Sequence, residues 1–188
     1  MNKTNIKQSR DRVFSVLAVV GALTVGAFFT LPNAQASQPV PATFSSTDCE
    51  HIISVEPHGP NTIITLSITA CFHGTFEGEY VGTERDVIHS NGAIAEGQGS
   101  GVFSGTVNGR SGTCVFSYHV NVPVAHWVVD RGTGDLAGLS GQGTQQFVSE
   151  DGPGCPTSGF DCENCPPPTG TCDDSFTLNN VGQILLAP

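Results

Sequence analysis

The sequence predicts an all-β protein in which eight antiparallel strands close into a barrel. Three observations lead to this fold class. No apolar pattern of helical period follows residue 47, whereas eight segments have strand character and are separated by recognisable turns. Glycine also alternates with aromatic or aliphatic residues on one face of two segments. Eight strands are enough to close a small barrel.

The eight expected strands follow one another through mostly short connections. They span residues 49–56, 62–72, 74–89, 93–107, 111–122, 125–130, 136–150 and 175–186. Two connections contain the dipeptide Asn-Gly, at Asn91 and Gly92 and again at Asn108 and Gly109. Asn-Gly is a strong hairpin signal because both residues tolerate a positive φ. The pattern therefore predicts a barrel built largely from hairpins.

The glycines of the third and fourth strands favour tight closure. One face of the third strand carries Gly74, Phe76, Gly78, Tyr80 and Gly82. The fourth strand has the same pattern, with Gly97, Gly99, Gly101, Phe103, Gly105 and Val107 on one face. A face that alternates between no side chain and a large one lets neighbouring strands interdigitate and bend, as a small closed barrel requires.

The N-terminal region has the pattern of a secretory signal peptide, residues 1–36. A basic head precedes an apolar run over residues 13–31, and Ala34 and Ala36 stand in the spacing of a cleavage site before Ser37. A retained membrane anchor is the alternative, because the apolar run approaches the length of a bilayer span. We expect residues 37–47 to be a flexible segment and residues 48–188 to form one barrel domain. The expected location is the periplasm or the exterior of the cell.

The charge balance after residue 36 limits the possible partners. Only Arg85, Arg110 and Arg131 remain as basic residues, against sixteen carboxylates. Such an acidic surface repels phosphate backbones and anionic lipid heads, which excludes nucleic acid as a partner. Contact with a membrane is expected only through the signal segment, if it stays uncleaved. The sequence does not indicate an oligomeric state.

Two glycine-rich motifs resemble a known family. Gly105, Gly109, Arg110 and Gly112 match a G-x-x-x-G-R-x-G hairpin, and residues 132–141 match G-T-G-(D/E)-L-x-G-L-x-G. This region, residues 74–144, resembles an uncharacterised bacterial family of allene oxide cyclase-like barrel proteins. The resemblance implies an eight-stranded antiparallel barrel related in shape to plant allene oxide cyclases and dirigent proteins. It carries over no catalytic residue, and the cysteine-rich insertion over residues 150–174 departs from the family pattern.

All seven cysteines follow residue 36, so in an exported chain they are first interpreted as disulfide partners. We expect two disulfides within the insertion, among Cys155, Cys162, Cys165 and Cys172. Zinc binding by these four residues and a redox role for Cys162 and Cys165 are weaker alternatives. A cross-strand disulfide between Cys49 and Cys71 is a further candidate, although a β-bulge is needed to bring both to one face.

No metal site or cofactor is expected from the histidines. Cys71 and His73 share one strand face, and His51, His119 and His126 lie elsewhere in the sequence. Nothing in their spacing brings three ligands together. Surface or hydrogen-bonded histidines are therefore the expected outcome.

The candidate ligand-binding residues are the aromatic and polar residues assigned to the barrel interior. They are Phe76, Tyr80, Phe103, Cys114, Phe116, Tyr118, Trp127 and Arg131. The aromatic rings either fill the barrel or line an apolar cavity with a few polar groups. An inward Arg131 would need a partner, either Asp135 or an anionic ligand.

Three function classes remain open. The first is an exported barrel that binds a small apolar ligand. The second is a cyclase or isomerase that folds a flexible apolar substrate, since catalysis by positioning needs few chemical groups. The third is a structural or surface protein with a filled barrel. Whether the protein is an enzyme stays open, and no catalytic residue is predicted.

The signal-peptide hypothesis gives a direct test. The mature exported protein should begin at Ser37, because the small residues before it fit the signal peptidase. Mass-spectrometric sequencing of the N-terminus measures this. An exported protein that retains residues 13–31 would identify the segment as an anchor.

Overall fold

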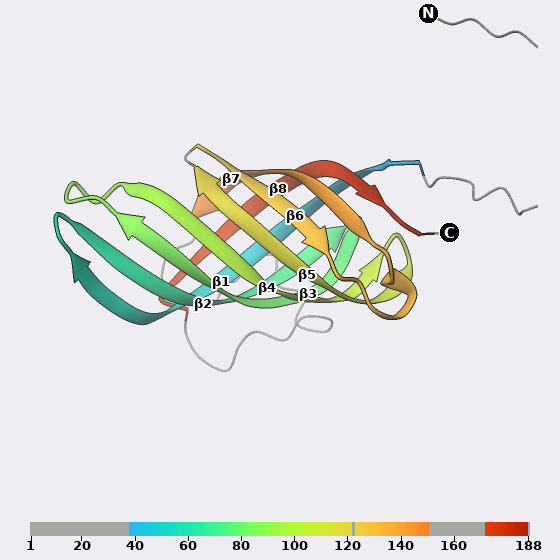
Figure 1. The fold of residues 1–188 in the computed structure, drawn as a ribbon, viewed down its shortest axis with the longest axis horizontal. Coiled ribbons are helices and arrows are strands. Elements are labelled where there is room, and N and C mark those ends of the chain that lie inside the picture. The colour runs from blue at the N-terminus through green and yellow to red at the C-terminus, as the bar shows by residue number, and fades with distance from the viewer. Residues whose placement is uncertain (1–37, 122, 151–171, 188) are drawn as a thin grey trace, which may run out of the picture. The chain divides into compact units, whose positions relative to one another are not determined.

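Eight antiparallel strands form a closed barrel in the computed structural model, in which each strand pairs with its neighbours in sequence and β8 pairs with β1 (Figure 1). The structure describes residues 38–121, 123–150 and 172–187. The strands are β1 (Val40–His58), β2 (Asn61–Gly74), β3 (Phe76–Ile88), β4 (Ile94–Val107), β5 (Arg110–Asn121), β6 (Val124–Asp130), β7 (Ser140–Glu150) and β8 (Asp174–Leu185). The predicted fold class is confirmed.

The first strand begins earlier than the sequence suggested. We expected a flexible segment over residues 37–47, but β1 starts at Val40 and pairs with β8 from Val40 to Glu50. Closure of the barrel requires this pairing, because β8 would otherwise expose an unpaired edge. Ala42 and Phe44 point inward and are buried.

The motif over residues 132–141 forms a turn rather than the start of a strand. Strand character was expected from residue 136, but a short 3₁₀ helix, η1 (Gly134–Leu136), precedes β7. Gly134 and Gly138 have positive φ values of 62° and 80°, which glycine adopts without strain. Leu136 and Leu139 are buried and join the hydrophobic core at this end of the barrel.

Aromatic rings fill the half of the barrel that η1 closes. Phe44 lies among them, with ring centroids 4.8 Å from Phe76 and 5.6 Å from Trp127. Phe116 stacks on Trp127 at 5.7 Å. The buried aromatic cluster comprises Phe44, Phe72, Phe76, Tyr80, Phe103, Phe116 and Trp127. Burial of these large rings supplies much of the apolar area that stabilises the barrel.

Glycines make room for these rings, as the alternation in the sequence predicted. A Cβ atom at Gly99 would collide with the ring of Tyr118, which lies opposite on β5. A Cβ atom at Gly143 or Gly182 would collide in the same way with Trp127. Each ring therefore occupies the space in which a side chain on the neighbouring strand would otherwise lie.

The two Asn-Gly hairpins differ in geometry. Asn108 and Gly109 have φ values of 50° and 78°, as a two-residue turn with two positive φ values requires. In the turn before β4, only Gly92 has a positive φ, of 83°, and the backbone N–H of Gly92 donates to the carbonyl oxygen of His89. Both hairpins are present, but the first is a wider turn.

The described disulfide joins Cys49 to Cys172, with 5.3 Å between the Cα atoms. The predicted bond between Cys49 and Cys71 is therefore wrong, although Cys71 is itself disulfide-bonded. The register pairs Cys49 with Thr69, so Cys49 and Cys71 do share a face, and a bulge between Ile52 and Ser54 reverses the alternation beyond them. Two disulfides confined to the insertion are also excluded, since Cys172 bonds to β1. Cys155, Cys162 and Cys165 lie outside the described residues.

Removal of the Cys49–Cys172 disulfide should destabilise the barrel strongly. The bond spans a sequence separation of 123 residues, and cross-links that close long loops restrict the unfolded chain most. The double variant Cys49→Ala/Cys172→Ala should lose about 2–5 kcal/mol of unfolding free energy. Urea denaturation of both proteins measures the difference. A loss below about 1 kcal/mol would contradict this account.

Candidate functional site

A pocket opens at the end of the barrel opposite η1. Its volume is about 420 Å³. Figure 1 shows that the β1–β2 and β3–β4 hairpins extend beyond the other strands at this end. We call this cavity the mouth pocket. The described residues that line it are Asp48, Glu50, Glu84, Asp86, Ile94, Tyr118, Val120, Pro123, Val124, Ala125, Gln145, Phe147, Phe176 and Leu178.

Two strands supply the four carboxyl groups of the mouth pocket. Successive side chains of a strand point to opposite faces, so residues two apart share a face. Asp48 and Glu50 therefore follow the inward-facing Phe44 on β1. Glu84 and Asp86 follow the inward-facing Tyr80 on β3. β2 lies between β1 and β3, so both pairs stand on the same side of the barrel interior.

These carboxyl groups were not expected from the sequence. Phe76, Tyr80 and Gly82 were assigned to the inner face of the third strand, but Glu84 and Asp86 continue the same alternation. The same two-residue period leads from Phe44 to Asp48 and Glu50 on β1. The signal was present, but inward acidic residues contradict the usual expectation that inward positions are apolar.

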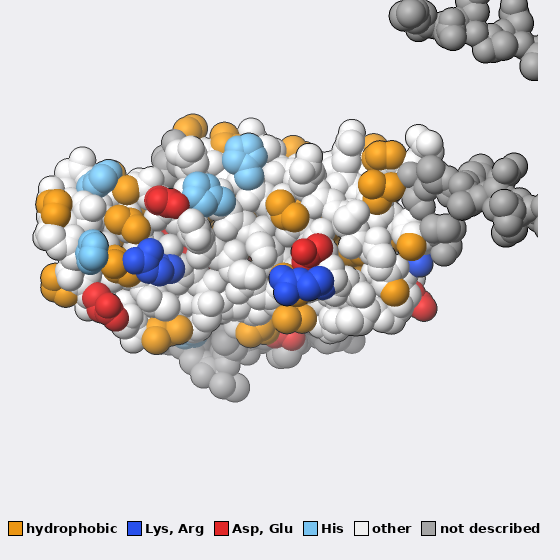
Figure 2. Space-filling model, viewed as in Figure 1, with side chains coloured by type: hydrophobic (Ala, Val, Ile, Leu, Met, Phe, Trp, Pro, Cys, Tyr) orange, Lys and Arg blue, Asp and Glu red, His pale blue; other side chains and the backbone are white. Residues whose placement is uncertain are grey.

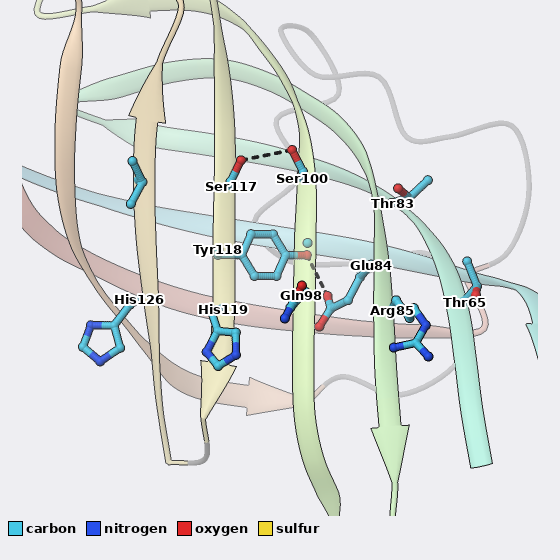
Figure 3. A pocket seen from close by; sticks show the side chains of 12 residues that line it. Thr65, Thr83, Glu84, Arg85, Gln98, Ser100, Ser117, Tyr118, His119 and His126 are labelled. Carbon is cyan, nitrogen blue, oxygen red and sulfur yellow. Dashed lines mark hydrogen bonds between the residues drawn. The ribbon is translucent and has the colours of Figure 1, made fainter. Parts of the chain in front are cut away.

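Hydrogen bonds satisfy only part of the four carboxyl groups Asp48, Glu50, Glu84 and Asp86, which we call the acidic floor of the pocket. The Tyr118 hydroxyl donates to Glu84 Oε2 at 2.6 Å (Figure 3). Glycine at position 97 leaves space for the carboxyl groups, because a Cβ atom there would approach Glu84 Oε1 to 2.9 Å. Asp48 Oδ1, Asp86 Oδ1 and the Tyr80 hydroxyl are buried without a hydrogen-bond partner among the described residues. Such groups are rare in native proteins and often mark a site of function.

Burial keeps protons on these carboxyl groups. Desolvation raises the pKa of Asp48 to about 7. It raises the pKa of Glu84 to about 8, with a further contribution from the charge of Asp86. Desolvation and the neighbouring carboxylates raise the pKa of Glu50 to about 9. No lysine, arginine or histidine is among the described residues that line the pocket.

Most of the predicted ligand-binding residues lie below the mouth pocket. Phe76, Phe103, Phe116 and Trp127 belong to the packed aromatic core and do not line the pocket. Cys114 is buried beside them as a free thiol, and desolvation raises its pKa to about 12. The interior is thus filled at one end and open at the other. Tyr118 lines the pocket, and Tyr80 belongs to the core, with its ring centroid 6.5 Å from that of Tyr118.

Arg131 does not point into the barrel as expected. Its side chain is 72% exposed, and its Nε donates to Asp130 Oδ1 at 3.0 Å. Its φ of 52° places it in the turn that follows β6, so the strand alternation that suggested an inward position has already ended. The predicted partner Asp135 is not used in this ion pair.

A second hollow, of about 640 Å³, lies on the outer surface over β2 to β6. Figure 3 shows Arg85, Gln98, His119 and His126 along it, and Ser100 Oγ lies 3.0 Å from Ser117 Oγ. Figure 2 shows charged and histidine side chains scattered among uncharged ones on one face of the barrel. This hollow is more open than the mouth pocket and does not concentrate one kind of group.

The histidines pair with acidic or polar neighbours rather than with one another. His119 Nε2 lies 3.1 Å from Glu96 Oε1, and His73 Nδ1 lies 3.0 Å from Glu77 Oε1. His51 Nε2 lies 3.8 Å from Cys49 Sγ. Among the residues that the structure describes, no group of three histidine, cysteine or acidic side chains is placed to hold a metal ion. Within the same residues, no helix has the length and apolar character needed to cross a membrane.

Solved structures share this fold. A protein of unknown function from the DUF3224 family of Shewanella oneidensis MR-1 is 15% identical, with a TM-score of 0.52 over 81% of this chain and 99% of that chain. The pterocarpan synthase dirigent protein PsPTS1 is 12% identical, with a TM-score of 0.50 over 82% of this chain and 99% of that chain. No protein-family model and no curated protein matches the sequence. The structural likeness confirms the barrel shape that the sequence resemblance implied, and at these identities it concerns the fold alone.

The buried carboxyl groups should make the barrel less stable as the pH rises. The pKa values of Asp48, Glu84 and Glu50 are raised in the folded state, so folding binds protons between about pH 4 and about pH 9. The stability that these groups contribute is complete below their unfolded pKa values and is lost as the pH passes the folded ones. Urea denaturation at pH 5, 7 and 9 should therefore give falling unfolding free energies.

The variant Asp48→Asn tests the origin of this trend. Removal of one titrating group should flatten the pH dependence between pH 5 and 8 and raise stability at pH 8. Asp135→Asn is the matched control, because Asp135 is exposed at the far end of the barrel beside η1. Equal slopes in Asp48→Asn and the unmodified protein would mean that other groups cause the trend.

Proposed function

We propose that the protein is an exported binding protein that holds a small molecule with an apolar body in the mouth pocket. The observation that carries this proposal is an open pocket that is lined by apolar side chains of β4 to β8 and by the carboxyl groups of β1 and β3. Small-molecule sites have this combination, in which the apolar wall provides affinity and a few polar groups fix orientation.

The rim of the pocket supports the same function. Phe147 is 56% exposed, and its ring packs edge-on against Phe176 with centroids 5.8 Å apart. An exposed aromatic residue gains stability when a ligand covers it. A purely structural role for the barrel offers no reason to leave Phe147 exposed beside a set of buried polar groups.

The proposed export has separate support. The disulfide between Cys49 and Cys172 forms and persists in oxidising compartments such as the periplasm or the exterior of the cell. The pattern of residues 1–36 provides the route. Export and ligand binding are independent parts of the proposal and are tested separately.

Catalysis is a second candidate function, favoured by one observation. Burial raises the pKa of Asp48 to about 7, close to neutral pH, and a group with such a pKa is suited to proton transfer. A protonated carboxyl group beside an apolar pocket could act as the general acid of a cyclase or isomerase. Incubation of the purified protein with a lipid extract separates the candidates, because mass spectrometry then finds either an unchanged bound molecule or a new product.

The binding proposal predicts that filling the pocket abolishes affinity for an apolar probe. Ala125 lies on the inner face of β6 opposite Val120, so Ala125→Trp places an indole in the pocket. Affinity for the neutral probe N-phenyl-1-naphthylamine, measured by titration calorimetry, should fall by at least about tenfold. Val102→Trp is the control, because Val102 is half exposed on the outer face of β4. Equal affinities in both variants would place the probe outside the pocket.

A further inference from the structure

We propose that the ligand of the mouth pocket is an organic cation, a protonated amine carried on an apolar body. This inference rests on the proposed binding function and specifies its substrate class. The ammonium group would lie on the floor between Asp48 on β1 and Glu84 on β3, and the apolar body would lie against the walls.

The charge balance of the pocket points to a cationic ligand. Asp48, Glu50, Glu84 and Asp86 line one cavity, and the described lining residues provide no basic side chain to oppose them. Buried charges in proteins are normally paired, because an unpaired one loses its hydration without compensation. Arg110 donates instead to the carbonyl oxygen of Ala187, and Arg131 pairs with Asp130 on the surface. A cation bound in the pocket would pair with these carboxyl groups and stabilise their charged form, which no basic side chain among the described lining residues does.

The Tyr80 hydroxyl is a second observation, independent of the acidic residues. Tyr80 is 2% exposed, and no described residue forms a hydrogen bond of good geometry with its oxygen, although the Tyr118 hydroxyl lies close enough to oppose part of the rise in the pKa of Tyr80. The charges of Asp48 and Glu84 both act on it, so it lies within reach of the same floor. Its oxygen can accept a hydrogen bond from an ammonium group. A ligand with several N–H donors would satisfy Tyr80 together with the unpartnered oxygens of Asp48 and Asp86.

The walls of the pocket decide between an organic and an inorganic cation. Divalent metal ions such as Ca²⁺ and Mg²⁺ take six or more oxygen ligands, and no three described acidic side chains are placed to share one. Ile94, Val124 and Leu178 instead present apolar surface above the floor. The ring of Phe147, which is 56% exposed, can also attract a cation. An amine with an aromatic or aliphatic body matches both halves of the pocket.

Binding of an amine would release protons at neutral pH. The titratable groups that face the floor are Asp48 and Glu50 from β1, Tyr80, Glu84 and Asp86 from β3, Tyr118 from β5, and Asp174, which acts on Glu50, from β8. The inner faces of β2, β4, β6 and β7 near the pocket contribute no described titratable group. A cation lowers the raised pKa values of the carboxyl groups. Its affinity should therefore increase as the pH rises from 5 to 8.

Three probes with one apolar body test the proposal on the full exported chain. They are 1-naphthylmethylamine, the neutral alcohol 1-naphthalenemethanol and the anion 1-naphthoate. At pH 8 the amine should bind about tenfold more tightly than the alcohol, and at pH 5 this advantage should largely disappear. Calorimetry in two buffers of different ionisation enthalpy should show proton release on amine binding at pH 7.

Substitution identifies the group responsible. Asp48→Asn should lower the affinity of the amine much more than that of the alcohol, which removes most of the amine's advantage. Asp135→Asn changes the net charge equally at the far end of the barrel and should change neither. Neutralisation of a buried carboxyl group is expected to preserve the fold, and circular dichroism checks this. Glu84→Gln provides a second variant that keeps an acceptor for the Tyr118 hydroxyl.

The outcomes separate the two proposals. Equal binding of the amine and the alcohol would overturn the cationic ligand but leave the binding function standing. Absence of binding by all three probes would overturn both. Tightest binding of the anion, or an amine advantage that Asp135→Asn reduces as much as Asp48→Asn, would also overturn the inference, the second outcome being nonspecific attraction to an acidic protein.

Discussion

The contact of the Tyr118 ring with the bare backbone of Gly99 is the constraint on which the arrangement of the interior depends. Gly99 is the partner of Tyr118 on the neighbouring strand β4, and because it lacks a side chain, the Tyr118 ring can lie over β4 and reach β3. The position of the ring places the Tyr118 hydroxyl on Glu84. Tyr118 thus separates a lower half packed with aromatic residues from an upper half left open, so the same glycine spacing that closes the barrel also sets the depth of the pocket.

The glycine–aromatic alternation allowed the fold to be predicted from the sequence, because it reflects a local packing requirement that recurs along two strands. The inward position of the pocket's carboxyl groups could not be recognised from the sequence in the same way. Glu84 and Asp86 continue the inner face of β3. Acidic residues at inward positions suggest that the inner face has been assigned to the wrong residues, unless a ligand is assumed. The first part of β1 was missed because two prolines precede Phe44 and three short polar residues follow it, and this segment forms a strand through its pairing with β8.

The disulfide shows a different limit of sequence analysis. Spacing suggested pairs among neighbouring cysteines, whereas Cys49 and Cys172 are brought together by the pairing of β1 with β8, which closes the barrel. Connectivity of this kind follows from the complete topology. The solved structures with this fold are 15% and 12% identical to this chain, so the likeness concerns the barrel and not the side chains at its open end.

The enclosed thiol of Cys114 bears on how the chain acquires its disulfides. Thiol–disulfide exchange proceeds through the thiolate, and a thiol that is 1% exposed with a pKa of about 12 supplies almost none. Once the aromatic rings pack around it, Cys114 is withdrawn from oxidation, and six cysteines, an even number, remain to be sorted. If the barrel closes before oxidation is complete, Cys114 can no longer form a disulfide. A disulfide to Cys114 would leave one of the other six cysteines without a partner, so early closure would prevent this mispairing.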